Sequence, residues 1–445
     1  MSKKAPRGKQ AFIPRIAERL PGPSLCQSGW LPGREARVAR RQRRVTRFGP
    51  REEKPHGSIE SNMESDLKIR HWMNIPSHYQ DAMFRALSRL RGVDFEALFL
   101  RRIGPERIAL GWAAGADPGY KIVEAGGSSR VLKALRNMHG DRIQILGGIW
   151  GEQEYAVAVI AGLLRRAPFA IVMEPSFPGP GESHVVAPRS PLIARLKTVL
   201  GSIAARAALC AFAISEPAYH ELLALGFDAQ RLFPFGYFVE PALENVQWSR
   251  DSRELIYAGQ FIERKGLETL LEAWAQVPAR EGYRLSLVGT GSQEAQLRAL
   301  ISRLGIASRT NIEPPVPASE IQQRIAGATL LVLPSHWDGW GVVVNEAYSV
   351  GVPVVVSDRA GARELVVHSG AGMVFRAGDS NALANVLRRA IQSPHLVREW
   401  AERALLYRQH ITPSRVAAYF ADCIRHALRV SRVSPDPPWR TQPPS

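Results

Sequence analysis

The chain has few cysteines for its 445 residues: Cys26, Cys210 and Cys423 lie far apart, without the spacing of metal ligands or of a redox pair. This spacing argues against a disulfide framework and against a zinc cluster, both of which need several cysteines at short intervals. We therefore predict three unpaired thiols in a reducing compartment, and hence a cytoplasmic protein.

Long apolar runs are also missing. The longest candidate, residues 156–172, is interrupted by Arg165, Arg166 and Pro168, whereas a membrane-spanning helix needs about 20 mostly apolar residues. The N-terminus has no apolar core of the kind found in signal peptides. The sequence predicts neither a membrane span nor secretion, and it leaves peripheral association with the inner face of the membrane open.

The net charge of +17 is concentrated at one end of the chain. Residues 1–62 hold 15 Lys and Arg against 5 Asp and Glu, residues 63–240 hold 20 against 17, and residues 241–445 hold 23 against 19. The first 62 residues also lack a sustained hydrophobic period, so we expect a disordered basic extension. We favour a misassigned start codon upstream of Met63, and the alternative is a tail that binds anionic lipid or nucleic acid.

From Met63 onward, short apolar runs alternate with amphipathic stretches, a pattern typical of parallel sheets covered by helices on both faces. The length suits two domains, which we place at 63–240 and 241–430, with a linker over 234–248 and a disordered Pro-rich tail over 431–445. The predicted strands cover 69–75, 95–100, 143–146, 169–173, 211–214, 255–257, 285–288, 330–333 and 352–356. The predicted helices cover 80–90, 154–164, 192–208, 267–276, 293–304, 342–349, 382–391 and 397–428.

The most informative segment is Leu331–Ala347, in which a buried strand, a Gly-containing loop and a helix follow one another. Ligands bind at such strand ends in parallel sheets, and the N–H groups at a helix start attract phosphate. Asp338 lies in the loop and Glu346 in the helix, so the two carboxylates could accept hydrogen bonds from several hydroxyls of one extended ligand. The alternative is a helix-capping Asp and a solvated Glu.

Two further segments end a strand with glycines. The first contains Gly259, Arg264 and Lys265, and the second contains Gly289 and Gly291. A cation at the start of a helix is normally unfavourable, which favours a ligand role for Lys265 over a solvated side chain. Glycines permit a close approach of backbone to ligand, although a simple packing turn explains Gly289 and Gly291 equally well.

Together these segments resemble the retaining GT-B glycosyltransferases, notably glycosyltransferase family 4 (glycosyl transferases group 1). The acidic pair resembles that family's Glu-x7-Glu motif, here Asp338-x7-Glu346, and the segment around Lys265 resembles its Gly-Arg-x(n)-Lys-Gly segment, in which n stands for a variable number of residues. Asp338 is one methylene shorter than the family's Glu, and Gln260 stands where the family has Arg, so Arg264 is the candidate second cation. The resemblance covers residues 68–430 and is strongest over 253–391.

The resemblance implies an α/β GT-B architecture: two Rossmann-like doubly wound domains facing a cleft, with the C-terminal helix crossing back. It implies that Glu346 binds the donor ribose, Asp338 the sugar hydroxyls and Lys265 the diphosphate, with retention of anomeric configuration and without a metal. Asp338, Glu346 and Lys265 are the predicted catalytic residues. The predicted donor-binding residues are Gly259, Arg264, Lys265, Gly289, Gly291, Asp338, Gly339, Trp340, Gly341, Val342 and Glu346.

The N-terminal half resembles the family less specifically. Pro76-Ser77-His78 replaces the family's Gly-Gly pair, and residues 235–240 resemble its interdomain hinge. Other candidate ligand residues, each also explained as an ordinary loop residue, are Glu174, His184, His336, the run 126–129 and the pair Gly147-Gly148.

The resemblance implies a nucleotide-diphosphate sugar and a glycan or lipid-linked acceptor as partners, with peripheral membrane association as an option. No nucleic acid, cofactor or metal is expected. The rival enzymes are a sugar-nucleotide epimerase or a phosphorylase of the same architecture, and the sequence gives no residues for either chemistry. The rival of another class is a basic protein that binds nucleic acid or a membrane surface and has a vestigial sugar site; its binding would fall steeply with salt.

Overall fold

The structure is a computed structural model that describes residues 67–104, 118–124, 134–136, 138, 140–150, 152–176, 191–240, 246, 248–279, 282–429, 431 and 433–440. All of them fall within one unit, residues 63–445. The basic extension 1–62, including Cys26, lies outside the described residues. Cys210 and Cys423 are buried free thiols, as predicted. Among the described helices, none is long and apolar enough to cross a bilayer.

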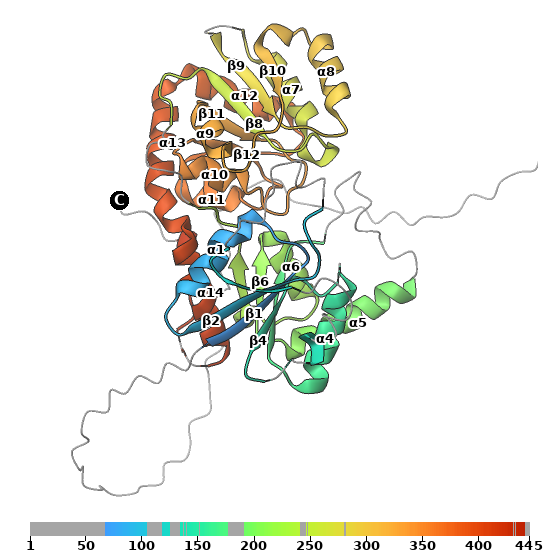
Figure 1. The fold of residues 1–445 in the computed structure, drawn as a ribbon. Helices are drawn as coiled ribbons and strands as arrows, with labels where there is room; N and C mark the ends of the chain where they lie inside the picture. The colour runs from blue at the N-terminus through green and yellow to red at the C-terminus, as the bar shows by residue number, and fades with distance from the viewer. Residues whose placement is uncertain are drawn as a thin grey trace, which may run out of the picture. The chain divides into compact units, whose positions relative to one another are not determined.

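The first half of the described chain builds a seven-stranded parallel sheet in the order β3-β2-β1-β4-β5-β6-β7. Figure 1 labels β1, β2, β4 and β6 of this sheet. Apolar strand residues fill the interior on both faces, which explains the short continuous apolar runs of the sequence. The strands are β1 (Leu67–Met73), β2 (Val93–Phe99), β3 (Lys121–Glu124), β4 (Ile143–Leu146), β5 (Phe169–Met173), β6 (Ala211–Ile214) and β7 (Leu232–Phe235). The helices are α1 (His78–Arg89), α4 (Gln153–Arg165), α5 (Pro191–Ala207) and α6 (Glu216–Ala224).

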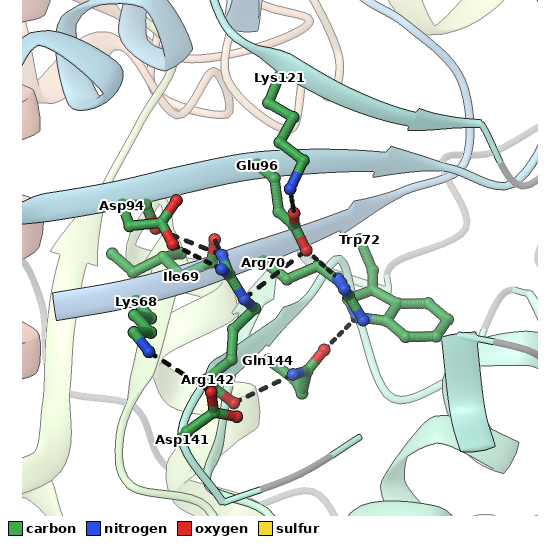
Figure 2. Close-up of polar contacts among 10 residues, drawn as sticks. All are labelled: Lys68, Ile69, Arg70, Trp72, Asp94, Glu96, Lys121, Asp141, Arg142 and Gln144. Carbon is green, nitrogen blue, oxygen red and sulfur yellow. Dashed lines mark hydrogen bonds and ion pairs between the residues drawn. The ribbon is translucent and has the colours of Figure 1, made fainter. Parts of the chain in front are cut away.

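A row of polar side chains crosses this sheet in register (Figure 2). Glu96 of β2 is paired with Arg70 of β1 and Lys121 of β3, and its carboxylate lies 2.5 Å from Arg70 Nε and 2.9 Å from Lys121 Nζ. Burial would raise the pKa of Glu96, but Lys121, Arg70 and Arg142 outweigh it and lower that pKa. Since a slip of one residue would separate these charges, the row helps to fix the strand register.

The second half builds a six-stranded parallel sheet in the order β10-β9-β8-β11-β12-β13. Its strands are β8 (Glu254–Ala258), β9 (Arg284–Val288), β10 (Thr310–Glu313), β11 (Leu330–Leu333), β12 (Val354–Ser357) and β13 (Gly372–Phe375). Its helices are α7 (Leu267–Gln276), α8 (Glu294–Arg303), α9 (Ile321–Ala326), α10 (Val343–Ser349), α11 (Arg363–Ser369) and α12 (Ser380–Gln392). The two doubly wound sheets confirm the predicted fold class.

The C-terminal helices return to the first sheet, as predicted. One helix was expected over 397–428, but the structure has α13 (Pro394–Tyr407), the short helix η5 (Arg408–Ile411) and α14 (Pro413–Ala427). The division lies at Pro413, whose ring has no N–H and fits the first turn of a helix better than its interior. α14 packs against α1, and Phe420 of α14 stacks on Phe212 of β6 at 4.2 Å between ring centroids.

The tail predicted to be disordered over 431–445 is ordered in its middle. Residues Pro438–Arg440 form the short helix η6, and Trp439 has no exposed surface. Its ring contacts Phe238 and Tyr419, with centroids 5.1 and 5.6 Å apart, and Tyr407 Oη donates a hydrogen bond to its carbonyl. Trp439 therefore fills the space between the hinge after β7 and the last two helices.

Trp439→Ala is expected to lower the free energy of unfolding by about 3–5 kcal/mol, because it removes a large buried aromatic side chain and leaves a cavity. Urea unfolding monitored by circular dichroism measures this change. Val433→Ala, at a side chain that is 76% exposed, is the control and should change stability by less than about 0.5 kcal/mol. Equal stability of the Trp439 variant and the unsubstituted chain would contradict the burial.

Candidate active site

Two loops meet where the strand order of the second sheet reverses. β8 leads into the loop that ends at Lys265, and β11 leads into the loop that contains Asp338. β8 and β11 are adjacent, parallel strands, so both loops leave the sheet at the same edge. This reversal point is where open α/β sheets bind their ligands.

Gly266 allows the two loops to touch. It has φ of +63°, and a Cβ at this position would lie 2.4 Å from the carbonyl oxygen of Pro334. A backbone hydrogen bond from Trp337 N to Arg264 O, 3.2 Å long, joins the loops beside it. Any side chain at Gly266 would push the β11 loop away, which explains in physical terms why glycine follows Lys265.

The predicted lysine and the first predicted acid form a partly buried ion pair. Lys265 Nζ lies 2.6 Å from Asp338 Oδ2, and Arg264 Nη1 lies 3.7 Å from Asp338 Oδ1. Burial would raise the pKa of Asp338, but the charges of Lys265 and Arg264 and a hydrogen bond from the Trp340 N–H lower it. The carboxylate is therefore ionised at neutral pH, and two cations lie at the loop junction.

The backbone around Asp338 is held on both sides. Asp338 N donates to Arg359 O and Gly361 N donates to Asp338 O, each over 3.1 Å, so the β11 loop pairs with the loop after β12. The Trp340 N–H contributes a hydrogen bond to the Asp338 carboxylate, and a contact of Trp340 with the donor stays a prediction. The position of Asp338 in the β11 loop is therefore fixed before a ligand binds.

Glu346 of α10 differs from Asp338 in its surroundings. Its side chain is only 5% exposed, and no charged group of the described residues contributes to its pKa. Burial alone raises the pKa of Glu346 from 4.5 to about 7. A buried carboxyl group without a cation is costly in an empty protein, and the hydroxyl groups of a ligand would satisfy it.

The predicted glycines of the donor loops contact other parts of the protein. A Cβ on Gly289 would lie 1.9 Å from Gly259 O, and a Cβ on Gly291 would lie 2.3 Å from Phe261 O. These glycines bring the loops after β8 and β9 together, which is the packing explanation that the sequence left open. Donor contacts of Gly259, Gly289 and Gly291 stay predictions.

The remaining predicted donor residues follow Asp338. Trp340 is 2% exposed, and its indole lies so close to Gly236 that a Cβ there would be 2.3 Å from the ring. Trp340 Nε1 also donates to Asn345 Oδ1 over 2.9 Å, so its described contacts are structural. Gly341 has φ of +94° and lies beside Asp338, and Val342 accepts the first hydrogen bonds of α10.

The first sheet contributes Glu174, one of several loop residues predicted as ligand candidates. Glu174 follows β5, and a Cβ on Gly339 would lie 3.0 Å from its Oε2. Tyr237 Oη donates a hydrogen bond to the other carboxylate oxygen. The side chain is exposed to a cavity, yet desolvation by the surrounding protein raises the pKa of Glu174, and nearby Asp338 raises it further.

That cavity has a volume of about 520 Å³ and lies at the carboxyl edge of the first sheet. Residues after β1 and β4, the strands at the reversal point of this sheet, contribute to its lining. Its walls combine aromatic rings with polar groups, a combination that suits carbohydrate. They include Asn74, Gly147, Trp150, Glu174, Lys197 and Tyr237.

Tyr237 was not predicted from the sequence, because its hydroxyl reaches a residue 63 positions earlier in the chain. The hinge resemblance over 235–240 was the only signal near it. His336 lies beside Gly266 and Gly378. His184 and the run 126–129 lie outside the described residues, whereas Gly147 and Gly148 line the cavity.

The loop junction can neutralise a diphosphate with Lys265 and Arg264, and Glu346 can accept hydroxyl hydrogen bonds. Negative charge grows on a diphosphate as it leaves, so cations placed there in advance stabilise the transition state. Within the described ranges, no three His, Cys, Asp or Glu side chains gather as a metal-ion site would require. The site residues therefore favour binding of a nucleotide-linked group.

Comparison with known proteins agrees with this chemistry. Residues 240–406 match the family model described as Glycosyl transferases group 1. The D-inositol 3-phosphate glycosyltransferase of Frankia alni is 27% identical over 335 residues, which cover 72% of this chain and 78% of that protein. The amylovoran biosynthesis glycosyltransferase AmsK of Erwinia amylovora is 28% identical over 46% of this chain and 54% of its own length.

Two solved structures share the fold. Anabaena Alr3699/HepE, solved with UDP, superimposes with a TM-score of 0.64 at 18% identity, covering 81% of this chain and 100% of that one. The lipopolysaccharide outer core galactosyltransferase WaaB has a TM-score of 0.59 at 18% identity over 81% of this chain and 99% of its own. The chain thus has the GT-B fold, and its residues 240–406 are similar to the glycosyl transferases of group 1.

Proposed function

We propose that this glycosyltransferase moves a hexose from a nucleotide-diphosphate sugar to a glycan or glycolipid acceptor, with retention of anomeric configuration. The observation that carries the proposal is the junction of the β8 and β11 loops, where Lys265 and Arg264 flank Asp338. Glu346, a buried carboxyl group whose pKa is not shifted by any charged group of the described ranges, follows on α10. Cations for a diphosphate and acceptors for hydroxyl groups are the two elements that a nucleotide sugar requires.

In this proposal the donor diphosphate becomes an ionic partner of Lys265 and Arg264 when the donor binds. The reaction needs no divalent cation. Asp338 then accepts hydrogen bonds from the transferred sugar, and Glu346 accepts them from the ribose. Uridine is the first base to test, since Anabaena Alr3699/HepE was also solved with UDP-glucose.

The acceptor enters the cavity of the first sheet. Glu174 lines this cavity and also lies against Gly339 of the donor loop, so the acceptor and the donor sugar meet near that contact. Attack from the side of the leaving group retains configuration, and a leaving phosphate oxygen can remove the acceptor proton. Glu174, held by Tyr237, orients an acceptor hydroxyl.

Thermal melting with UDP, GDP, ADP and CMP tests the donor site. A ligand at a hundredfold excess over its Kd stabilises the folded state by about 2.7 kcal/mol, so the cognate nucleotide should raise Tm by a few degrees. The matching nucleotide sugar, incubated with a mixture of glycan and glycolipid acceptors in EDTA, should give a product with the donor's anomeric configuration by NMR.

Each alternative has its own outcome in the same experiment. An epimerase would convert the sugar nucleotide without releasing the nucleotide diphosphate. A binding protein with a vestigial sugar site would show no melting shift with any nucleotide. An inverted product would contradict retention, and activity that disappears in EDTA would contradict the metal-free mechanism.

A further inference from the structure

Exposed apolar side chains gather on two neighbouring helices of the first half. Among the described residues, twelve large apolar side chains are exposed, and six of them belong to α4 and α5, which contact each other. These six define the α4–α5 patch: Val157 (46% exposed), Ile160 (46%), Leu164 (81%), Leu196 (58%), Val199 (54%) and Ile203 (41%).

The spacing forms one stripe on each helix. Positions 157, 160 and 164 of α4, and positions 196, 199 and 203 of α5, follow the same i, i+3, i+7 pattern, which places three side chains on one face of a helix. Scattered exposed apolar residues need no explanation, whereas an apolar stripe on each of two helices that contact each other indicates an interaction site.

Basic residues border the patch. Arg165 and Arg166 end α4, and Arg195 and Arg206 of α5 lie on one side of its stripe; all four are exposed. α5 contains no Asp or Glu, and the one acidic residue within α4 is Glu154 in its first turn. An apolar stripe bordered by Arg is the pattern of helices that lie in the interface of an anionic membrane.

We propose that the α4–α5 patch docks the protein on an anionic lipid bilayer. A second copy of the chain fits less well, because a symmetric contact through this patch would bring Arg against Arg without acidic partners. The bilayer supplies both an apolar layer for the six side chains and negative headgroups for the arginines.

The α4–α5 patch lies on helices that also border the cavity of the first sheet. Lys197 of α5 and Tyr155 of α4 line the cavity of the first sheet, so the helices that hold the patch also form part of the cavity wall. A docked protein would therefore present that cavity near the headgroup layer. The docking surface itself does not depend on the proposed transfer reaction.

Sedimentation of the full chain with sucrose-loaded vesicles tests the proposal. Vesicles of phosphatidylglycerol and phosphatidylcholine in equal amounts are compared with vesicles of phosphatidylcholine alone, in about 0.1 M salt, where screening acts over ~10 Å. The triple variant Leu164→Ser, Leu196→Ser, Val199→Ser should bind the mixed vesicles at least about tenfold more weakly, because less apolar surface enters the interface.

The matched control is Val367→Ser, Leu406→Ser, Val433→Ser, which changes three equally exposed apolar side chains elsewhere (64%, 59% and 76%). It should bind within about twofold of the unsubstituted chain. Residues 1–62, with 15 basic side chains, are present in all proteins, so their contribution to vesicle binding cancels in these ratios.

A second variant separates charge from apolar contact. The double variant Arg195→Gln, Arg206→Gln should weaken binding to the mixed vesicles about tenfold, because each cation near an anionic surface contributes to the binding free energy. Its binding to vesicles of phosphatidylcholine alone should be unchanged. Equal binding of the patch variant and the control variant would overturn the proposal. A patch-dependent dimer in light scattering would assign the surface to a second copy instead.

The UDP-induced melting shift should be the same in all these variants, so a failure of membrane docking is distinguishable from a failure of the donor site.

Discussion

Lys265→Ala is expected to lower kcat about a thousandfold, the largest loss that we predict for a single substitution. Removing one preorganised charge or donor from a site of developing negative charge costs about 10²–10³ in kcat. Lys265 is 13% exposed and pairs with Asp338 at 2.6 Å, so its ammonium group is held in place before the donor arrives. Turnover of the nucleotide sugar, measured as released nucleotide diphosphate, tests this expectation.

The ion pair allows another explanation, in which Lys265 serves only to neutralise Asp338. The double variant Lys265→Ala, Asp338→Asn separates the two. The reference is Asp338→Asn alone, because Asp338 itself contacts the sugar in this proposal. If neutralisation is the only role of Lys265, Lys265→Ala should cost no further turnover in the Asp338→Asn background; if Lys265 binds the diphosphate, the double variant should be far more impaired than Asp338→Asn. Arg298→Ala, at an exposed i,i+4 pair with Glu294, is the control and should keep full turnover.

Glu346→Gln is expected to weaken donor binding and to stabilise the empty protein. A carboxylate accepts two strong hydrogen bonds from vicinal hydroxyls, whereas an amide offers one neutral acceptor, and hydrogen bonds to charged groups contribute about 1.5–3 kcal/mol. The Kd of the nucleotide should therefore rise at least about tenfold. Isothermal titration calorimetry measures this change.

The stability gain follows from the pKa of Glu346, which burial raises from 4.5 to about 7. Between these values the folded state binds more protons than the unfolded state, so stability falls as the pH rises from about 4.5 to about 7. A carboxyl with this shift weakens the fold by about 3 kcal/mol above pH 7. Glu346→Gln should remove that pH dependence, so the variant is more stable at pH 8 and similar at pH 4.

Glu320→Gln, at an exposed side chain, is the control and should leave both the pH profile of unfolding and the nucleotide Kd unchanged. A Glu346 variant that is less stable than the unsubstituted chain at pH 8 would contradict the isolated burial of this carboxyl group.

Long elements with a clear period were predictable from the sequence. α7 was expected over 267–276 and has those bounds, since its apolar residues follow one helical face and Gly266 precedes it. β3, β7, β10 and β13 were missed, because polar residues, a proline or a glycine interrupt their four-residue apolar runs, whereas the equally short β6 and β11 are wholly apolar. The predicted linker from Pro234 also overlapped β7, whose place is set by pairing with β6, a contact between distant residues.

The candidate site was predictable only where a local motif marks it. Lys265 and Asp338 are 73 positions apart. Each lies in a local motif that identifies it from the sequence, whereas their ion pair follows only from the structure. The link from Glu174 to Gly339 and the hydrogen bond from Tyr237 depend on how the strands and the hinge are placed, which no short segment encodes. Trp439 was missed for the same reason, because a Pro-rich tail has no period that reveals a buried side chain.

The packing of α14 on α1 has a consequence for how the chain folds during synthesis. These helices come from residues 413–427 and 78–89. During synthesis α1 therefore cannot pack against α14 until nearly the whole polypeptide has left the ribosome. Contacts of such high sequence separation form slowly and leave apolar surface uncovered meanwhile. Phe212, which stacks on Phe420 of α14, is thus expected to stay without this cover in the nascent chain until late in synthesis.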